Sequence, residues 1–376
     1  MSLPPVTYLS FDSMADGVGW SQVVPYVSGL ARRGVEVTLH SFEKAEPDRL
    51  VSERLAAAQV RWRPHPFRVG GSAGGLARVV QGAALVAGAE LVHARSDMAA
   101  ASTLVAGRRA WVWDVRSFWR EQRIAAGQIR AGSHPDRALR TVEGRAAARS
   151  TGVVTLTKAA VDVLVERHGP QMAAKSQVIP TCVELERFTC SPLPPPVPLR
   201  FLLAGTLSTV YDVPTMLALV KRVRRRRPAE LAVLTPQATA WDDHLAVAGI
   251  TSARAGRAEM PARVAASHLG LSVLRPDLGV SSRAITPTKL GEFLASGRPV
   301  IVNAGLGDMD ELIAAYDCGV VLRDRSEDGL EEAAEEIGRL MDDGGTPGRC
   351  RKLAESHFDV ERGVDQLLEL YGQAAR

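Results

Sequence analysis

The sequence predicts two α/β domains, each built around a doubly wound parallel sheet. Its 376 residues exceed the roughly 250 to 300 residues beyond which a single hydrophobic core rarely keeps growing. Short apolar runs alternate with helical stretches in both halves of the chain, which is typical of strands joined by crossover helices. Five prolines within residues 190–200 interrupt this alternation, because such a segment cannot continue a helix or a central strand.

The first half of the chain contains apolar runs of strand length separated by helical stretches. In open sheets of this kind, ligands bind at the carboxyl ends of the strands, so the loops that follow them are the candidate site. The candidate strands are residues 6–11, 35–42, 60–67, 91–95, 110–116, 153–157 and 177–183, and the helices include residues 20–32, 76–87, 98–106, 136–149 and 158–167.

The second half repeats the alternation after the proline-rich break. Its candidate strands are residues 199–204, 231–235, 251–255, 269–274, 300–303 and 319–322. We therefore expect an N-terminal Rossmann-like domain, a stiff linker, a C-terminal Rossmann-like domain and an amphipathic tail helix that can cross back to the first domain, with a cleft between the facing loops of the domains. The corresponding ranges are 1–188, 189–199, 200–355 and 356–376.

Charge and cysteine content restrict the function classes. Because 46 basic residues face 42 acidic ones, the net charge of +4 is a weak indication of nucleic acid, and we predict none. The basic cluster at 221–228, "KRVRRRRP", is read as a solvated helix end, with weak contact to an anionic membrane surface as the alternative. Four isolated cysteines favour neither zinc nor disulfides. We expect a cytoplasmic protein, free or peripheral at the inner membrane face, without signal peptide or membrane span; nothing indicates its oligomeric state.

Residues 286–303, "TPTKLGEFLASGRPVIVN", predict a helix followed by a strand, with Thr286 as cap and Pro287 at the first position. Lys289 then lies in the first turn, where the helix dipole already favours negative charge. A bound diphosphate would explain this lysine, and Glu292, one turn later, could accept hydrogen bonds from ribose hydroxyls. The alternative is an exposed ion pair worth a few tenths of a kcal/mol, on the order of other surface pairs.

Residues 287–313, "PTKLGEFLASGRPVIVNAGLGDMDELI", resemble the donor-site segment of family 4 glycosyltransferases, which have the GT-B fold. Further blocks that look like one branch of this family follow in family order. They are residues 16–44, 91–107, 111–123, 153–164, 178–188 and 201–212.

The resemblance implies a retaining, metal-independent glycosyltransferase that moves a hexosyl or related sugar from a nucleoside diphosphate (NDP) sugar to an acceptor hydroxyl. The UDP or GDP sugar is a substrate, so no cofactor is expected. The acceptor would be a polysaccharide or glycolipid intermediate, or the core of a natural product. Two alternatives stay open: a nucleotide-sugar epimerase on the same fold, and a catalytically silent protein that binds NDP-sugars.

The resemblance also assigns roles to residues of the second domain. Lys289 and the backbone near Thr288 and Leu290 would bind the donor diphosphate, and Glu292 the ribose. Further donor-site candidates are Thr206, Arg283, Gly307 and Asp308, together with the first-domain glycines Gly17 and Gly19, which would let backbone amides approach phosphate. The family often carries a second glutamate where this chain has Ala284, so contacts to the sugar are expected from elsewhere.

In the first domain, residues 111–123, "WVWDVRSFWREQR", gather several charged side chains at the end of a strand. Arg116 is a candidate for phosphate or acceptor binding, and Asp114 or Glu121 for orienting the acceptor hydroxyl. Arg95 and Ser96 end another strand at the same rim and are further acceptor candidates. The alternative is a set of surface ion pairs around packed aromatic side chains.

Two other signals are read structurally. His93 lies within an apolar strand and is interpreted as a core histidine. Asp308 and Asp310 imitate a metal-binding acid pair, but acids are favoured at a helix start in any case, so we predict no metal.

Overall fold

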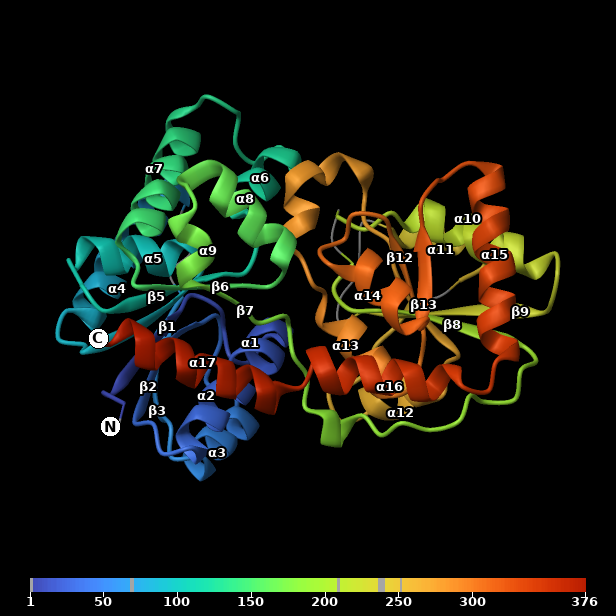
Figure 1. Cartoon of the computed structure of the whole chain (residues 1–376), viewed down its shortest axis with the longest axis horizontal. Coiled ribbons are helices and arrows are strands. Elements are labelled where there is room, and N and C mark those ends of the chain that lie inside the picture. Colours follow the sequence, from blue (N-terminus) through green and yellow to red (C-terminus); the bar gives the residue numbers. More distant parts are fainter. Residues whose placement is uncertain (1–2, 68–70, 208–209, 236–240, 251) are drawn as a thin grey trace. The chain divides into compact units, whose positions relative to one another are not determined.

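The computed structural model describes residues 3–67, 71–207, 210–235, 241–250 and 252–376 (Figure 1). The chain forms two compact units, Met1–Cys182 with Val360–Arg376, and Val183–Asp359. The first division lies six residues before the boundary expected at residue 188. The second division follows Asp359, so the tail belongs to unit 1 from Val360 onward. Both units contain a parallel sheet flanked by helices, which confirms the predicted fold class.

Unit 1 contains a seven-stranded parallel sheet in the order β3-β2-β1-β4-β5-β6-β7. The chain starts in the middle, at β1, proceeds to one edge and then returns to build the other half, so the strand order reverses between β1 and β4. The strands are β1 (Val6–Ser10), β2 (Val37–Glu43), β3 (Arg61–Pro66), β4 (Leu91–Arg95), β5 (Trp111–Val115), β6 (Gly152–Thr155) and β7 (Ser176–Val178).

The helices of unit 1 cover this sheet. They are α1 (Gly17–Gln22), α2 (Val24–Arg32), α3 (Arg49–Ala57), α4 (Gly71–Val86), α5 (Ser96–Val105), α6 (Trp119–Ala125), α7 (His134–Arg149), α8 (Lys158–His168), α9 (Gln171–Lys175) and α17 (Val360–Ala374). The prediction of a single helix over 20–32 is wrong in one respect, because the chain forms two helices, one on each side of Val23.

The tail helix α17 packs against α2 of unit 1 (Figure 1). Two glycines permit this close approach, since a Cβ on Gly29 would lie 2.6 Å from a Val364 methyl group and one on Gly363 would lie 3.0 Å from the Tyr26 ring. At the helix edge, the Arg33 guanidinium binds the carboxylates of Glu361 and Asp365. Packing and charge therefore both tie the C-terminus to the N-terminal unit.

Unit 2 contains a six-stranded parallel sheet in the order β10-β9-β8-β11-β12-β13, which reverses between β8 and β11. Its strands are β8 (Leu199–Ala204), β9 (Ala229–Leu234), β10 (Ser252–Ala253), β11 (Leu269–Ser272), β12 (Val300–Asn303) and β13 (Gly319–Leu322). Its helices are α10 (Val213–Arg224), α11 (Asp242–Val247), α12 (Met260–Ala265), α13 (Thr288–Ala295), α14 (Met309–Tyr316), α15 (Glu327–Asp342) and α16 (Thr346–His357), with 3-10 segments η1 (Leu185–Arg187) and η2 (Pro276–Ala284).

The proline-rich segment predicted as a linker is fixed to unit 2. The guanidinium of buried Arg298 donates to the backbone carbonyls of Ser191 and Pro192 at 2.8 and 3.1 Å. Nε2 of buried His268 lies 3.2 and 3.1 Å from the carbonyls of Pro194 and Pro195. Side chains of unit 2 thus supply the hydrogen bonds that a segment without regular secondary structure needs.

The basic cluster predicted at the end of α10 is paired in part with acids of α15. Arg222 forms ion pairs with Glu327 and Glu331, and Arg226 binds Glu331 and Glu335. These contacts agree with a solvated helix end and reduce the positive surface available to a membrane. Among the described residues, no helix combines the length and apolarity that crossing a bilayer requires.

Candidate functional site

The predicted donor residues of unit 2 lie where its strand order reverses. The loop after β8 contains Gly205 and Thr206, and the chain after β11 continues through η2 to α13. A Cβ built on Gly205 would lie 3.9 Å from Cγ of Lys289, so the two segments meet beside the lysine side chain. This is the position at which open α/β sheets bind ligands.

Lys289, on the first turn of α13, forms an ion pair with Glu292, which lies one turn later. The Lys289 ammonium donates to both carboxylate oxygens of Glu292 at 2.9 and 2.8 Å. The lysine side chain is 25% exposed and the glutamate side chain 8%. The ion pair that was the alternative reading of this spacing is therefore present, but it is not fully exposed: a nearly buried carboxylate holds an ammonium that solvent can still reach.

The start of α13 differs from the prediction. The helix begins at Thr288 and its N-cap is Pro287, so the expected cap by the Thr286 side chain is wrong. Its first turn has no acidic residue. The amide of Leu290 donates to the Pro287 carbonyl at 3.0 Å and its side chain is buried, so this amide is already used. Lys289 is the second residue of the helix, so its side chain lies at the positive helix end.

The loop after β12 closes another side of this region. The Gly307 amide donates to the Ser282 carbonyl at 3.0 Å, which joins the loop to η2 near Arg283. The backbone of Gly307 has a φ of 53°, a conformation that favours glycine. Asp308 is the N-cap of α14 and is half-buried, whereas Asp310 accepts from the Gly305 amide at 3.1 Å. Asp310 thus stabilises the loop.

Two other predicted positions contribute differently. Thr206 is exposed at the end of β8, whereas Ala284 is fully buried and provides no polar group where a second glutamate was considered. Sequence reasoning missed Asn303, a buried side chain at the end of β12. Its Oδ1 accepts from the Leu274 amide at 2.8 Å, so it joins the ends of β11 and β12.

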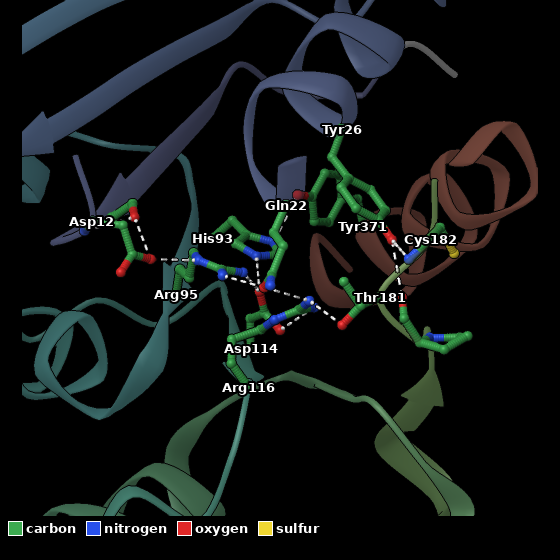
Figure 2. A network of polar contacts seen from close by, with 12 residues as sticks. Asp12, Gln22, Tyr26, His93, Arg95, Asp114, Arg116, Thr181, Cys182 and Tyr371 are labelled. Carbon is green, nitrogen blue, oxygen red and sulfur yellow. Dashed lines mark hydrogen bonds and ion pairs between the residues drawn. The ribbon is translucent and has the colours of Figure 1, made fainter. Parts of the chain in front are cut away.

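In unit 1, two of the predicted acceptor residues, Arg95 and Arg116, belong to a largely buried polar network at the carboxyl ends of β1, β4 and β5 (Figure 2). The Arg95 guanidinium lies between two carboxylates: its Nε donates to Asp12 at 2.8 Å and its Nη1 to Asp114 at 3.5 Å. Nη2 of Arg95 donates to Gln22 at 2.8 Å. Arg116 binds Asp114 at 3.4 Å and the same Gln22 oxygen at 3.3 Å.

The charges of this network fix the protonation of its buried groups. Burial alone would raise the pKa of Asp114, but Arg116, His93 and Arg95 hold it well below its ordinary value. Burial lowers the pKa of His93, so its ring is neutral near pH 7. The ring's Nε2 lies 3.2 Å from the Asp114 carboxylate and its Nδ1 lies 2.8 Å from the hydroxyl of Tyr371. Nε2 therefore carries the proton and Nδ1 accepts from Tyr371.

These contacts refine the predictions for the first domain. His93 is buried as predicted, yet it also belongs to the network, because Tyr371 from the tail helix reaches it. Asp114 is only 2% exposed and already binds three partners, which suits positioning Arg95 and Arg116. The catalytic roles predicted for Asp114 and Arg116 stay predictions.

Glu121 lies away from the network. Its carboxylate accepts from Arg120 at 2.9 Å and from Arg167 at 2.7 Å. Trp113 and Phe118 are buried nearby in the chain. For Glu121 the structure thus shows the ion pairs around packed aromatic residues that were the alternative reading of this segment.

The glycines after β1 have separate roles. A Cβ on Gly19 would lie 2.2 Å from the Ser13 carbonyl oxygen, so this residue must be glycine for α1 to pack on its own loop. Gly17 has no atom within 4 Å of such a Cβ. At the start of α5, Ser96 has a φ of 72°, which is uncommon for a residue with a side chain.

A large cavity lies within unit 1 beside the network. Its volume is about 1040 Å³, and Asp12, Gln22, Arg95, Ser96 and Arg116 form part of its wall. Apolar side chains from α4, α5 and α7 form much of the remaining lining. The cavity can therefore hold a ligand that is apolar over most of its surface and polar where it meets the strand ends.

Asp97 is a cavity residue whose loss of a proton we expect to lower the stability of the fold. Burial, together with the nearby negative charge of Glu143, raises the pKa of its carboxyl to about 7. The folded chain then holds a proton that the unfolded chain loses near pH 3.8, so stability falls as pH rises from about 4 to about 7. Asp97→Asn should remove this dependence, because asparagine resembles the neutral acid.

The measurement is urea unfolding of both chains at pH 5 and pH 8, followed by tryptophan fluorescence. The unfolding free energy of Asp97→Asn minus that of the wild type should be about 1 to 2 kcal/mol larger at pH 8 than at pH 5. This stays below the limit of about 1.4 kcal/mol per unit of pKa shift. An equal difference at both pH values would contradict the raised pKa.

No protein-family model matches the chain, and no curated protein matches it. Solved structures nevertheless share its fold. Sucrose-phosphate synthase from Thermosynechococcus elongatus superposes with a TM-score of 0.73 at 15% identity, covering 98% of each chain. HepE from Anabaena, solved with UDP and glucose, gives 0.68 at 14% identity, over 97% of this chain and 98% of the other. WaaG, a glycosyltransferase involved in lipopolysaccharide biosynthesis, gives 0.67 at 16% identity, over 96% and 98%.

These similarities confirm the GT-B fold expected from the sequence, with two Rossmann-like units. At such low identity they establish the arrangement of the elements in each unit. The chemistry of the protein depends on its own residues at the site.

Proposed function

We propose that this protein is a retaining glycosyltransferase that uses an NDP-sugar donor, with UDP-sugars as the first candidates. The observation that carries the proposal is the ion pair between Lys289, on the first turn of α13, and Glu292, at the reversal point of the unit 2 sheet. Similarity to structures described as glycosyltransferases, and to one solved with UDP and glucose, supports it.

Lys289 can exchange its partner Glu292 for a ligand. The Lys289 ammonium is partly exposed, and a phosphate oxygen can form the same kind of charge-assisted hydrogen bond with it as the Glu292 carboxylate does. A diphosphate at the helix start can therefore bind Lys289 and leave Glu292 to accept hydrogen bonds from the ribose hydroxyls. The positive helix end adds to this preference.

The proposed reaction needs stabilisation of the leaving group. The bond between the anomeric carbon and the diphosphate oxygen breaks, and its electron pair leaves with the NDP. The acceptor oxygen forms a bond to the same face of the anomeric carbon, and its proton passes to the departing phosphate oxygen. Lys289 and the amides at the start of α13 meet the charge that develops on the diphosphate.

In this proposal, unit 1 binds the acceptor. Arg95 ends β4, at the reversal point of the sheet, and Arg116 follows the neighbouring strand β5. Both contact the cavity, while Asp114 and Gln22 hold their guanidinium groups in place. We retain the prediction that the protein acts in the cytoplasm.

Incubation with UDP-glucose and other NDP-sugars, with and without candidate acceptors, tests the proposal. Release of NDP that depends on the acceptor, with a product of retained anomeric configuration by NMR, is the expected result. Isomerisation of the donor without acceptor would instead identify an epimerase, and binding without turnover a silent sugar-nucleotide-binding protein. An inverted product would contradict the same-face mechanism.

We expect transfer to continue in the presence of excess chelator. Among the described residues, no three His, Cys, Asp or Glu side chains gather in a possible metal site, and Asp310 is bonded to its own loop. Turnover in millimolar EDTA should equal that of the untreated protein. Loss of activity that Mg²⁺ or Mn²⁺ restores would contradict a metal-independent mechanism.

A further inference from the structure

We propose that the unit 1 cavity selects an acceptor with an apolar body and a negatively charged group, and that Arg123 binds that charge. The inference rests on the proposed function and goes beyond it, because it names the chemical class of the acceptor. It is carried by the lining of the cavity, by the balance of charge around it and by two guanidinium groups with unused donors.

The apolar part of the lining is large and accessible. Leu76, Val79, Met98, Leu104, Leu139 and Val142 contribute to it from α4, α5 and α7. Leu76 and Val105, both in the lining, are 67% and 64% exposed. Apolar side chains of this size normally remain in water only singly, so their grouping around a cavity indicates a surface that a ligand covers.

The charged part of the lining is strongly basic. Six arginines and two aspartates line the cavity, and Asp12 already binds Arg95. Within the described ranges, Arg123, Arg145 and Arg149 form no ion pair, so an excess of positive charge faces the cavity. A neutral apolar ligand would leave that charge unmatched, whereas an anionic one complements it.

The side chain of Arg123 is held in position to bind an anion. Its guanidinium lies over the Trp119 ring, 4.8 Å from the ring centre, which holds the side chain in place. In the part of the chain that the structure describes, the buried Nε atoms of Arg123 and of Arg116 have no hydrogen-bond partner. Buried donors are almost always satisfied, so these two side chains are not fully bonded within the protein, and a guanidinium that lines the cavity without an ion pair can bind an anion.

Three naphthalene probes test the inference: 1-naphthyl phosphate, 1-naphthol and 1-naphthylmethylamine. They share an apolar body and differ in charge, and their affinities can be measured by fluorescence titration of the full chain. We expect the phosphate to bind at least about tenfold more tightly than naphthol, and the amine to bind most weakly. Equal affinities, or preference for the amine, would overturn the inference.

Two variants with matched controls locate the probe. Arg123→Ala should weaken naphthyl phosphate about tenfold and leave naphthol within about twofold, whereas Arg130→Ala, an exposed arginine outside the lining, should change neither. Ala101→Trp, which places a large side chain in the cavity, should abolish binding of both probes, unlike Ala148→Trp on the exposed part of α7. Unchanged binding in Arg123→Ala or Ala101→Trp would overturn the assignment.

UDP titration of the same proteins separates this inference from the proposed function. We expect each variant to bind UDP as the wild type does, because the altered residues belong to unit 1. If UDP binds and naphthyl phosphate does not, the acceptor inference fails alone. If naphthyl phosphate binds in the cavity and no nucleotide or NDP-sugar binds, the proposed function fails and the cavity is not an acceptor site.

Discussion

Lys289→Ala should weaken UDP binding by about 10- to 100-fold, because it removes a charge-assisted hydrogen bond worth roughly 1.5 to 3 kcal/mol. The Lys289 ammonium is a quarter exposed and is held at the start of α13 by the Glu292 carboxylate, so it is already positioned for a diphosphate. Isothermal titration calorimetry with UDP measures the loss directly.

Uridine provides the internal control for this variant. Its ribose can still bind Glu292, but it has no phosphate, so its affinity should change by less than about threefold. Lys352→Ala on α16 removes a lysine charge elsewhere in unit 2 and should leave UDP binding intact. An equal loss for uridine and UDP would show that the substitution disturbs the site as a whole and would contradict a specific phosphate contact.

Arg95→Met should be among the most destabilising substitutions in unit 1. The Arg95 side chain is 2% exposed and binds Asp12, Gln22 and Asp114, so its loss leaves a buried carboxylate with fewer partners. Removal of one member of a buried ion pair costs about 3 to 5 kcal/mol. Urea unfolding should detect this as an earlier loss of tryptophan fluorescence, since five of the six tryptophans belong to unit 1.

Arg49→Met is the matched control for this measurement. Arg49 pairs with Glu53 on α3, but its side chain is 90% exposed, so the expected change is about 0.5 kcal/mol or less. If both variants had the same small effect, the network at the strand ends would not stabilise unit 1, and its proposed role in holding Arg95 would be wrong.

The strands were the most predictable part of the fold. Buried parallel strands are short continuous apolar runs, and residues 91–95, 199–204, 300–303 and 319–322 form strands over the predicted ranges. Errors arose where backbone geometry depends on local packing. The turn of the chain at Val23 and the cap of α13 at Pro287 are examples.

The candidate sites were predictable where they are contiguous in sequence. Lys289 and Glu292 lie three residues apart on one helix, so their contact follows from their spacing. Asp12, Gln22 and Thr181 reach the network from distant segments, and Tyr371 reaches it from the tail helix, so no local pattern could reveal them. The same holds for Arg298 and His268, which fix the proline-rich segment to unit 2.

A crystal structure of the protein with bound UDP-sugar tests the central claim most directly. The account predicts that the diphosphate lies within hydrogen-bond distance of the Lys289 ammonium at the start of α13, with the ribose hydroxyls on Glu292. A nucleotide bound elsewhere, with Lys289 and Glu292 still bonded only to each other, would contradict it.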